Sequence, residues 1–359
     1  MKICILSIVN IKHMSLISLY TSFFEKNGIE YDIIYIDKYN EEEKISANNV
    51  YRFPLSINRK WNKMKKLAAY WKFKDYAESI IKKNKYDFVI VWRTETAIMF
   101  SNFLSKNLKG NYCINIRDYC MEKNPFVFFR VKHAIKSSRF TTISSDGFKK
   151  FLPKYNYLTV HSYNEELLLN CKPKIRLNNY NEPIRICFIG YVRFFDIDKK
   201  LIDALGNDHR YIIQFFGEGS QELKTYADNK GIVNTEFIGG FPLEDTVKLL
   251  GSADVINNLY GFNNIALDTA ISTKFYYALH QFIPILVFKK TFMEEISKEC
   301  GLGFAVGDDF SNLADTFYEW YHSLSFDELK WNCLHEIEEI KKSNSNFQNL
   351  LENTFMRNF

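Results

Sequence analysis

Cationic side chains lie at the starts of two predicted helices in the second half of the chain. Lys274 falls in the first turn of a helix that precedes a short apolar strand. Arg193 follows a glycine turn at Gly190, which closes another apolar strand, and Lys199 or Lys200 opens the helix beyond it. A helix N-terminus and a nearby cation both favour negative charge, so this pattern predicts a site for a phosphate or diphosphate group.

Charged residues also follow two apolar strands of the first half. Arg93 and Glu95 come after one strand, and Arg117 and Asp118 come after the next. Ligands of open α/β sheets bind beyond the carboxyl ends of the strands, so these side chains are candidates for substrate contact. The Asp118 carboxylate could orient or deprotonate a hydroxyl group. The alternative is a structural role, as a surface ion pair with Arg117 or as a cap on the next helix.

The elements that must position these residues repeat in a strand–helix–strand order. The chain begins with this pattern, and Ser15 is predicted to cap its first helix and Gly28 to end it. The spacing is what a parallel, doubly wound sheet requires. After a segment rich in proline, asparagine and lysine at 173–183, the pattern restarts at 184–190. The restart predicts two similar α/β domains joined by a linker.

The composition limits the functions that the chain can have. Its 359 residues, 47% hydrophobic and 25% charged, predict about two folded domains with buried cores. A net charge of only +5 is mild and does not suggest a nucleic-acid partner, whose binding surface would gather its charge in one strong patch. None of the seven cysteines forms a C-x-x-C pair, which favours reduced thiols in the cytoplasm. No apolar run reaches the ~20 residues that span a bilayer, so we expect any membrane contact to be peripheral.

A basic amphipathic segment at 57–76 is the candidate for such a contact. It carries seven lysine and arginine residues against one aspartate, and Trp61, Met64, Leu67 and Trp71 recur at helical spacing. A helix of this kind can lie on an anionic membrane surface, at the inner face of the plasma membrane. The alternative is a surface helix that packs its apolar stripe on the sheet.

Residues 272–286 carry a resemblance to a known family. Five positions match the pattern P-x-K-[LF]-[YF]-E-Y-x-A-x-G-x-P, namely Lys274, Phe275, Tyr276, Leu279 and Pro284. This stretch resembles the donor-site helix of GT-B glycosyltransferases of the family 4 kind. Ser272, Tyr277 and Phe282 depart from the pattern, because they stand where proline, glutamate and glycine are usual. The glutamate usually holds the donor ribose, so its loss bears on donor identity.

Other segments of the second half resemble the same family in order and spacing. The resemblance assigns Arg193 and Lys199 or Lys200 to the donor diphosphate, and Phe241 to the nucleotide base. The loop at 259–269 would hold the sugar and phosphates, although Asp268 lies one place from the family's acidic position at Thr269. The donor-binding residues implied in this way are Gly190, Gly217, Gly219, Phe241, Tyr260, Gly261, Asn263, Asn264, Asp268, Phe275 and Tyr277.

A run at the end of the first half, residues 140–164, resembles the family segment that forms one lip of an interdomain cleft. His161 and Asn164 fill its last part. His161 is therefore a candidate for acceptor binding, and its alternative role is that of a core or lip residue. The acceptor-binding residues implied for the first domain are Arg93, Glu95, Arg117 and His161, with Asp118 as the catalytic carboxylate.

The resemblance implies an α/β protein of the GT-B fold, in which two Rossmann-like, doubly wound domains face an interdomain cleft. It places an acceptor-binding domain at 1–172 and a nucleotide-sugar donor-binding domain at 184–339. A C-terminal helix at about 340–359 is expected to cross back to the first domain.

The implied activity is that of a hexosyltransferase. It would move a sugar from a nucleotide-diphosphate sugar, with a UDP-sugar expected, to a hydroxyl of a saccharide acceptor. The acceptor would be a lipid-linked intermediate of capsule, O-antigen or exopolysaccharide synthesis. Arg193, Lys199 and Lys274 would stabilise the departing diphosphate, so no metal or other cofactor is expected. A D-x-D triplet at 196–198 is interpreted as a helix cap at Asp198. Two alternatives stay open, an inactive binding or scaffold protein and a nucleotide-sugar 2-epimerase.

Overall fold

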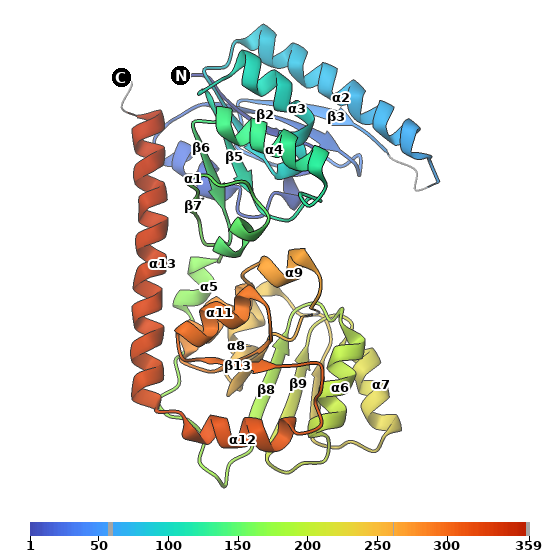
Figure 1. Ribbon diagram of the computed structural model, residues 1–359, viewed down its shortest axis with the longest axis vertical. Coiled ribbons are helices and arrows are strands. Elements are labelled where there is room, and N and C mark those ends of the chain that lie inside the picture. The colour runs from blue at the N-terminus through green and yellow to red at the C-terminus, as the bar shows by residue number, and fades with distance from the viewer. Residues whose placement is uncertain (57–59, 261, 357–359) are drawn as a thin grey trace. The chain divides into compact units, whose positions relative to one another are not determined.

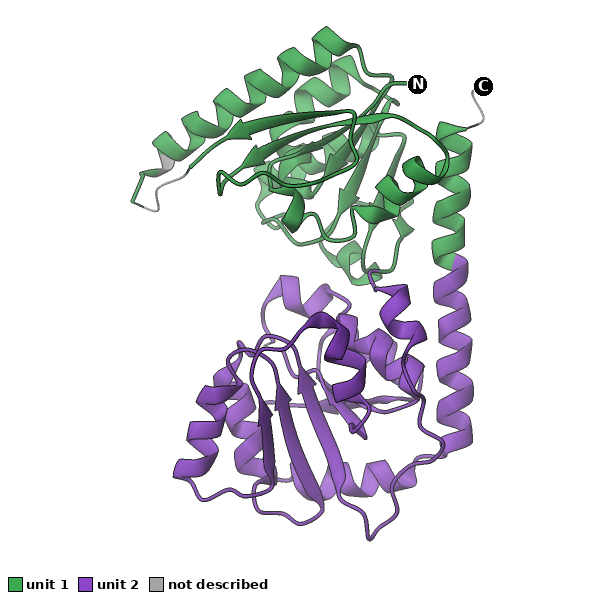
Figure 2. Cartoon of the chain, turned by 180° about the vertical axis from the view of Figure 1, so that it is seen from behind, with its two compact units in different colours: residues 1–161, 343–359 green, residues 162–342 purple. Residues whose placement is uncertain are grey.

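Two compact α/β units make up the chain in the computed structural model (Figure 1). The residues that the structure describes are 1–56, 60–260 and 262–356. Unit 1 comprises Met1–His161 together with Ser343–Phe359, and unit 2 comprises Ser162–Lys342 (Figure 2). The segment 173–183, predicted as the linker, therefore belongs to unit 2. There the Lys174 ammonium lies 2.8 Å from a carboxylate oxygen of Asp254.

Unit 1 is built on a parallel sheet of seven strands, counted over the described residues, in the order β3-β2-β1-β4-β5-β6-β7. Every residue of β1, β4 and β5 is buried, as expected for central strands covered on both faces. The strand order reverses between β1 and β4, where Ile3 pairs with both Tyr31 and Phe88. The strands are β1 (Ile3–Ser7), β2 (Tyr31–Asp37), β3 (Asn49–Pro54), β4 (Phe88–Trp92), β5 (Tyr112–Ile116), β6 (Phe140–Ile143) and β7 (Leu158–Thr159).

The helices of unit 1 begin and end where capping residues allow. Helix α4 has Pro125 in its first turn, and the Asn124 side chain accepts hydrogen bonds from two backbone amides of that turn. Helix α1 begins at Ser18, so the prediction that Ser15 caps it was wrong, whereas Gly28 follows its end with a positive φ of 63°. The helices are α1 (Ser18–Lys26), α2 (Lys63–Asn84), α3 (Thr94–Asn107) and α4 (Pro125–Ser137), with 3-10 turns at Ile11–His13 and Asp146–Lys150.

Unit 2 repeats the arrangement with six parallel strands, again over the described residues, in the order β10-β9-β8-β11-β12-β13. This is the strand order of a doubly wound nucleotide-binding sheet. The order reverses between β8 and β11, where Val255 pairs with Ile186. The strands are β8 (Ile184–Ile189), β9 (Tyr211–Phe216), β10 (Thr235–Ile238), β11 (Val255–Asn257), β12 (Ile285–Phe288) and β13 (Gly303–Val306).

Helices cover both faces of this second sheet and enclose two apolar clusters. One cluster includes Phe275 and Leu279 of α10, and the other includes Leu201 of α6 and Phe317 of α12. The predicted α/β class with two doubly wound sheets is thereby confirmed. The helices are α5 (Glu165–Leu169), α6 (Phe195–Leu205), α7 (Ser220–Asn229), α8 (Thr246–Leu250), α9 (Ile265–Thr269), α10 (Thr273–Gln281), α11 (Phe292–Glu299) and α12 (Leu313–Ser323), with a 3-10 turn at Leu243–Asp245.

The last helix, α13 (Phe326–Phe355), contributes to the cores of both units. Its first half carries Cys333 and Ile337, which are buried in the α10 cluster of unit 2. Its last turns belong to unit 1, where the Phe355 ring lies 5.2 Å from that of Phe24 and the Phe347 ring lies 5.2 Å from that of Tyr20. A terminal helix that returns to the first domain was predicted.

Candidate ligand site of unit 2

Two loops that follow the neighbouring strands β8 and β9 meet at one edge of the unit 2 sheet, and glycines allow their close approach. The Gly190 amide donates to the Phe216 carbonyl, 2.9 Å away. A Cβ atom on Gly217 would lie 1.8 Å from the Gly190 carbonyl oxygen, and the φ of Gly217 is 144°. Only glycine fits both conditions. The predicted glycine turns after β8 and β9 therefore bring two backbone segments together at the carboxyl edge of the sheet.

Helix α10 begins at this edge with a capped N-terminus. The Ser272 hydroxyl accepts a hydrogen bond from the Lys274 amide at 3.3 Å. Lys274 and Phe275 of the first turn are both buried, with exposed fractions of 4% and 1%. Phe275, which the resemblance assigned to donor binding, lies in the apolar core instead.

The Lys274 ammonium occupies an aromatic and hydroxyl environment. Its Nζ atom donates to the Tyr260 hydroxyl at 2.5 Å and lies 4.3 Å from the centre of the Phe188 ring. In the described part of the chain, no carboxylate lies within ion-pair distance of Lys274 or Arg193, whereas Lys199 pairs with Glu222 at 3.1 Å. Ring faces and a hydroxyl stabilise a buried cation less than an anion does. Lys274 is therefore ready to receive an anionic ligand.

Tyr260 connects the two cations. Burial raises the pKa of its phenol, but the charge of Lys274, hydrogen bonds with Lys274 and Ser272 and the charge of Arg193 lower it, and the net pKa lies below the ordinary value of 10. The balance reports a positive electrostatic potential around the Tyr260 hydroxyl.

Asp198 lies in the first turn of α6, where the charge of Lys274 acts on its carboxyl group. Helix α6 begins at Phe195 and its N-cap is Phe194, so the interpretation of Asp198 as a cap was wrong. Its side chain is 1% exposed. Burial raises the pKa of Asp198 to about 7, although Asn257 and the Lys274 charge oppose the rise.

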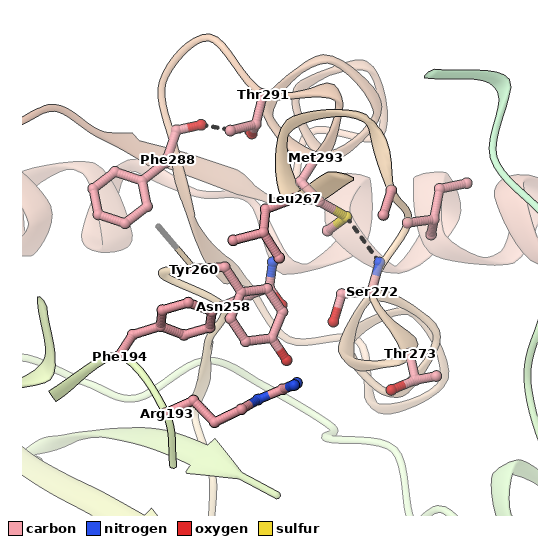
Figure 3. Close-up of a pocket in the computed structure, with 12 residues that line it drawn as sticks. Arg193, Phe194, Asn258, Tyr260, Leu267, Ser272, Thr273, Phe288, Thr291 and Met293 are labelled. Atoms are coloured by element: carbon pink, nitrogen blue, oxygen red, sulfur yellow. Dashed lines mark hydrogen bonds between the residues drawn. The ribbon is translucent and has the colours of Figure 1, made fainter. Parts of the chain in front are cut away.

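Two pockets open beside the start of α10, and Thr273 lines both. The smaller one has a volume of about 200 Å³ and is shown in Figure 3, where Arg193 and Tyr260 lie below Leu267. The larger one has a volume of about 370 Å³. The smaller is lined by Arg193, Phe194, Asn258, Tyr260, Leu267, Ala270, Ile271, Ser272, Thr273, Phe288, Thr291 and Met293. The larger is lined by Ile189, Gly190, Tyr191, Gly217, Glu218, Gly240, Phe241, Leu243, Thr246, Thr273, Lys274 and Tyr277.

The pockets bring together five of the eleven donor-binding residues predicted from the sequence, along with the cations Arg193 and Lys274. Those that line a pocket are Gly190, Arg193, Gly217, Phe241, Tyr260, Lys274 and Tyr277. Lys199 is absent from both linings, because it lies on the α6 surface against Glu222 of α7. Gly219 begins α7 with a φ of 91°.

The predicted sugar loop is only partly placed at the pockets. Asn263 and Asn264 are exposed, and the Asn264 side chain caps α9 by accepting from the Ala266 amide at 3.1 Å. Asp268 belongs to the same short helix. Gly261 lies outside the described residues.

In unit 1, the predicted acceptor residues form a charged cluster at the ends of β4 and β5. Arg93 lies 3.2 Å from carboxylate oxygens of both Glu95 and Asp118. The Arg117 guanidinium is stacked 5.7 Å from the Trp92 ring centre. The sequence analysis missed a fifth member, Glu122.

Burial also shifts the pKa values of Glu122 and His161 in unit 1. Glu122 is 1% exposed, and burial raises its pKa to about 7 against the hydrogen bond from the Cys120 amide. Burial lowers the pKa of His161 to about 4, so its imidazole is neutral at pH 7. The His161 amide donates to the Asn344 side chain at 3.0 Å.

The described residues contain neither a candidate metal site nor a helix suited to span a membrane. No group of three or more histidine, cysteine, aspartate or glutamate residues among them is arranged to hold a metal ion. None of the described helices combines the length and the apolar character needed to cross a membrane.

Comparisons with known proteins identify the fold. No protein-family model matches the chain, and no curated protein does. Among solved structures, sucrose-phosphate synthase from Thermosynechococcus elongatus superimposes with a TM-score of 0.69 at 11% identity over 99% of both chains. The lipopolysaccharide galactosyltransferase WaaB gives a TM-score of 0.68 at 12% identity, over 98% of this chain and 100% of that one. The chain has the GT-B fold.

Two further solved structures share this fold, and one of them is an epimerase. Anabaena HepE, solved with UDP, gives a TM-score of 0.68 at 10% identity over 98% of this chain and 100% of that one. The UDP-GlcNAc 2-epimerase from Methanocaldococcus jannaschii gives a lower TM-score of 0.56 at 13% identity over 89% and 92% of the two chains. The chain therefore shares its fold with transferases and with an epimerase.

Several residues that line the pockets of this GT-B chain were not predicted from the sequence, among them three polar ones, Glu218, Asn258 and Thr246. Glu218 stands between the two glycines after β9, and Asn258 directly follows β11. Thr246 opens α8. A signal existed for the first two, because each is a polar residue at the carboxyl end of a parallel strand.

Proposed function

We propose that the chain is a glycosyltransferase that moves a sugar from a nucleotide-diphosphate sugar to a hydroxyl of a saccharide acceptor. The observation that carries the proposal is the pair of cations at the carboxyl edge of the unit 2 sheet. Lys274 and Arg193 line adjoining pockets and make no ion pair within the described residues. A diphosphate would supply the missing charge.

The larger pocket is suited to the nucleoside. Phe241 and Tyr277 offer aromatic faces for a base, and the Glu218 carboxylate can accept hydrogen bonds from ribose hydroxyls. Glu218 would thus take the role of the family's ribose-binding glutamate, whose position Tyr277 occupies in this chain. A UDP-sugar is the expected donor, in keeping with the UDP bound in Anabaena HepE and the UDP-2-fluoroglucose bound in a trehalose-6-phosphate protein of E. coli.

The mechanism that follows is electrostatic. Negative charge develops on the diphosphate as the bond to the sugar breaks, and Lys274 and Arg193 would stabilise it without a metal ion. The Lys274 position is fixed by Tyr260, so little reorganisation is needed. In unit 1, Asp118 would orient the acceptor hydroxyl, with Arg93, Glu95, Arg117 and His161 binding the acceptor.

The acceptor is proposed to be a lipid-linked saccharide of capsule, O-antigen or exopolysaccharide synthesis, presented at an anionic membrane surface. Helix α2 supports this, because Met64, Leu67 and Trp71 are 74%, 51% and 51% exposed. Phe73 and Ala77 of the same helix are fully buried. The predicted apolar stripe therefore does not pack on the sheet. Residues 57–59 of the predicted segment lie outside the described residues.

Vesicle sedimentation tests the membrane contact. The full chain should bind vesicles of phosphatidylcholine with phosphatidylglycerol, and the Leu67→Ser, Trp71→Ser double variant should lose most of that binding. Trp331→Ser is the matched control, because Trp331 is 66% exposed on α13. Binding that the double variant retains would rule out α2 as the contact.

Titration calorimetry with UDP tests the nucleotide site. Lys274→Ala and Arg193→Ala should each weaken UDP binding by about tenfold or more, since each removes a charged partner of the diphosphate. Lys230→Ala is the control, because Lys230 pairs with Asp203 on the surface of unit 2. Equal affinity in all variants would refute the site.

An inactive scaffold is the second candidate, and the aromatic residue Tyr277 at a signature position favours it. Release of UDP from a UDP-sugar separates the two, because a scaffold releases none. The epimerase remains a third candidate through the fold alone. It would convert UDP-N-acetylglucosamine without an acceptor, which proton NMR of the sugar detects.

A further inference from the structure

The smaller pocket of unit 2 has few groups that could pair with sugar hydroxyls. Half of its lining is apolar, namely Phe194, Leu267, Ala270, Ile271, Phe288 and Met293. Its described lining includes no carboxylate. Among the polar members, the Thr291 hydroxyl already donates to the Phe288 carbonyl at 2.8 Å, as Figure 3 shows. A sugar hydroxyl placed against these apolar residues would lose its hydrogen bonds to water without replacing them.

One polar side chain of this pocket is held without a partner. Asn258 is 3% exposed, and its carboxamide oxygen is buried with no hydrogen-bond partner among the described residues. Its backbone is fixed, because the Asn258 amide donates to the Leu286 carbonyl at 3.0 Å. A buried amide group without a partner destabilises the native state. Such a group is the expected recognition element for a ligand that brings its own donor.

The pocket also adjoins the proposed diphosphate site. Tyr260 lines the small pocket, and its hydroxyl accepts from Lys274 Nζ at 2.5 Å. Thr273 lines both pockets. The carbon next to the anomeric centre of a donor sugar lies within a few bonds of the diphosphate. A substituent on that carbon therefore falls within reach of Asn258 and the apolar wall.

We propose that the donor is a nucleotide 2-acetamido sugar whose acetamido group is recognised by Asn258. The acetamido N–H donates to the Asn258 oxygen, which satisfies the buried acceptor. The methyl group packs against Leu267 and Met293, which both line the pocket (Figure 3). This inference rests on the proposed function and adds the class of sugar to it.

Titration calorimetry with matched donors tests the inference. The ligands are UDP alone, UDP-glucose with UDP-N-acetylglucosamine, and UDP-galactose with UDP-N-acetylgalactosamine. In at least one pair, the acetamido donor should bind about tenfold tighter or more, because it gains one buried hydrogen bond and one buried methyl group. Asn258→Leu, which is of similar shape, should reduce this preference to about threefold or less while UDP binding is retained.

A second variant covers the case in which Asn258→Leu does not fold, as judged by its melting temperature. Leu267 lies on the short helix α9 and lines the pocket. The Leu267→Asn variant should also reduce the preference for the acetamido donor, since it makes the apolar wall polar. Leu169→Asn is its control, because Leu169 is 77% exposed and lines neither pocket. This control should keep the full preference.

The outcomes separate the inference from the function on which it rests. If UDP and all UDP-sugars fail to bind, the proposed function fails. If UDP binds but the two donors of each pair bind equally, the acetamido assignment is overturned. A preference that survives both Asn258→Leu and Leu267→Asn overturns it as well, because the selective contact must then lie elsewhere.

Discussion

The substitution Lys274→Met separates the role of Lys274 in binding from its role in the fold. Methionine has nearly the length of lysine and no charge, so it keeps the packing of a side chain that is 4% exposed. What it removes is the ammonium that donates to Tyr260 and lies over the Phe188 ring. The change therefore tests whether this cation is present for stability or for a ligand.

The expected loss of UDP affinity can be estimated from the position of the charge. Two unit charges 4 Å apart interact by about 4 kcal/mol at an effective dielectric constant of 20, and hydrogen bonds to charged groups contribute about 1.5–3 kcal/mol net. A loss of about 2–4 kcal/mol corresponds to a Kd about 30- to 1000-fold higher. The free energy of unfolding should change by less than about 2 kcal/mol, because relief of cation burial offsets the lost Tyr260 hydrogen bond.

The assays are UDP titration calorimetry and urea denaturation of the same protein preparations. Lys230→Met is the matched control, since Lys230 makes its ion pair with Asp203 away from the pockets. The reasoning is refuted if Lys274→Met lowers the free energy of unfolding by more than about 4 kcal/mol while UDP affinity in the folded fraction changes less than about threefold.

Three further predictions concern the surroundings of the site. Gly217→Ala should destabilise the protein by about 3 kcal/mol or more in urea denaturation, because its Cβ would lie 1.8 Å from a carbonyl oxygen, whereas Gly239→Ala has open space and should be nearly neutral. Asp198→Asn should gain stability over the wild type by about 1–4 kcal/mol as pH rises from 4 to 8. The native state holds the Asp198 proton up to about pH 7, so the wild type loses the stability that this proton contributes as the pH rises through this range. A difference in the free energy of unfolding between variant and wild type that does not change with pH would contradict the prediction. Lys199→Ala should leave UDP affinity within about twofold, since Lys199 pairs with Glu222, and a loss as large as that of a pocket cation would refute this placement.

The fold was predictable because its signals are local and repeated. Each apolar strand of unit 2 is followed by a turn or loop, and most of these lead into a helix, so the restart at 184–190 identified a second sheet. The close contact between Gly190 and Gly217 was not predicted, although both glycines directly follow neighbouring strands. The helix boundary at Ser18 was missed because α1 has no side-chain cap to mark its start.

The positions of Lys199 and Asp198 show what the sequence analysis overlooked. The buried residues of α6 are Asp198, Leu201, Ile202 and Leu205, which share one face at helical spacing. Lys199 follows Asp198 directly and is therefore turned away from that face. The helical spacing of the apolar residues therefore indicates that Asp198 faces inward, whereas the family resemblance had assigned the site role to Lys199.

Contacts across the fold could not be read from the sequence. Tyr260 precedes Lys274 by 14 positions, and their hydrogen bond depends on how the loop after β11 folds against α10. Phe282 occupies the left-handed region with a φ of 55° at a position where the family pattern has glycine. The chain therefore keeps the left-handed turn that glycine favours, although the residue here is phenylalanine. A comparison of residue types alone cannot reveal that the turn is kept.

The central claim is that the cations of unit 2 bind the diphosphate of a nucleotide sugar. A crystal structure of the full chain grown with UDP tests it most directly. We predict that the diphosphate lies within hydrogen-bond distance of Lys274 Nζ and the Arg193 guanidinium, with the uracil in the pocket of Phe241 and Tyr277. UDP bound at any other place, with Lys274 still donating only to Tyr260, would contradict the account.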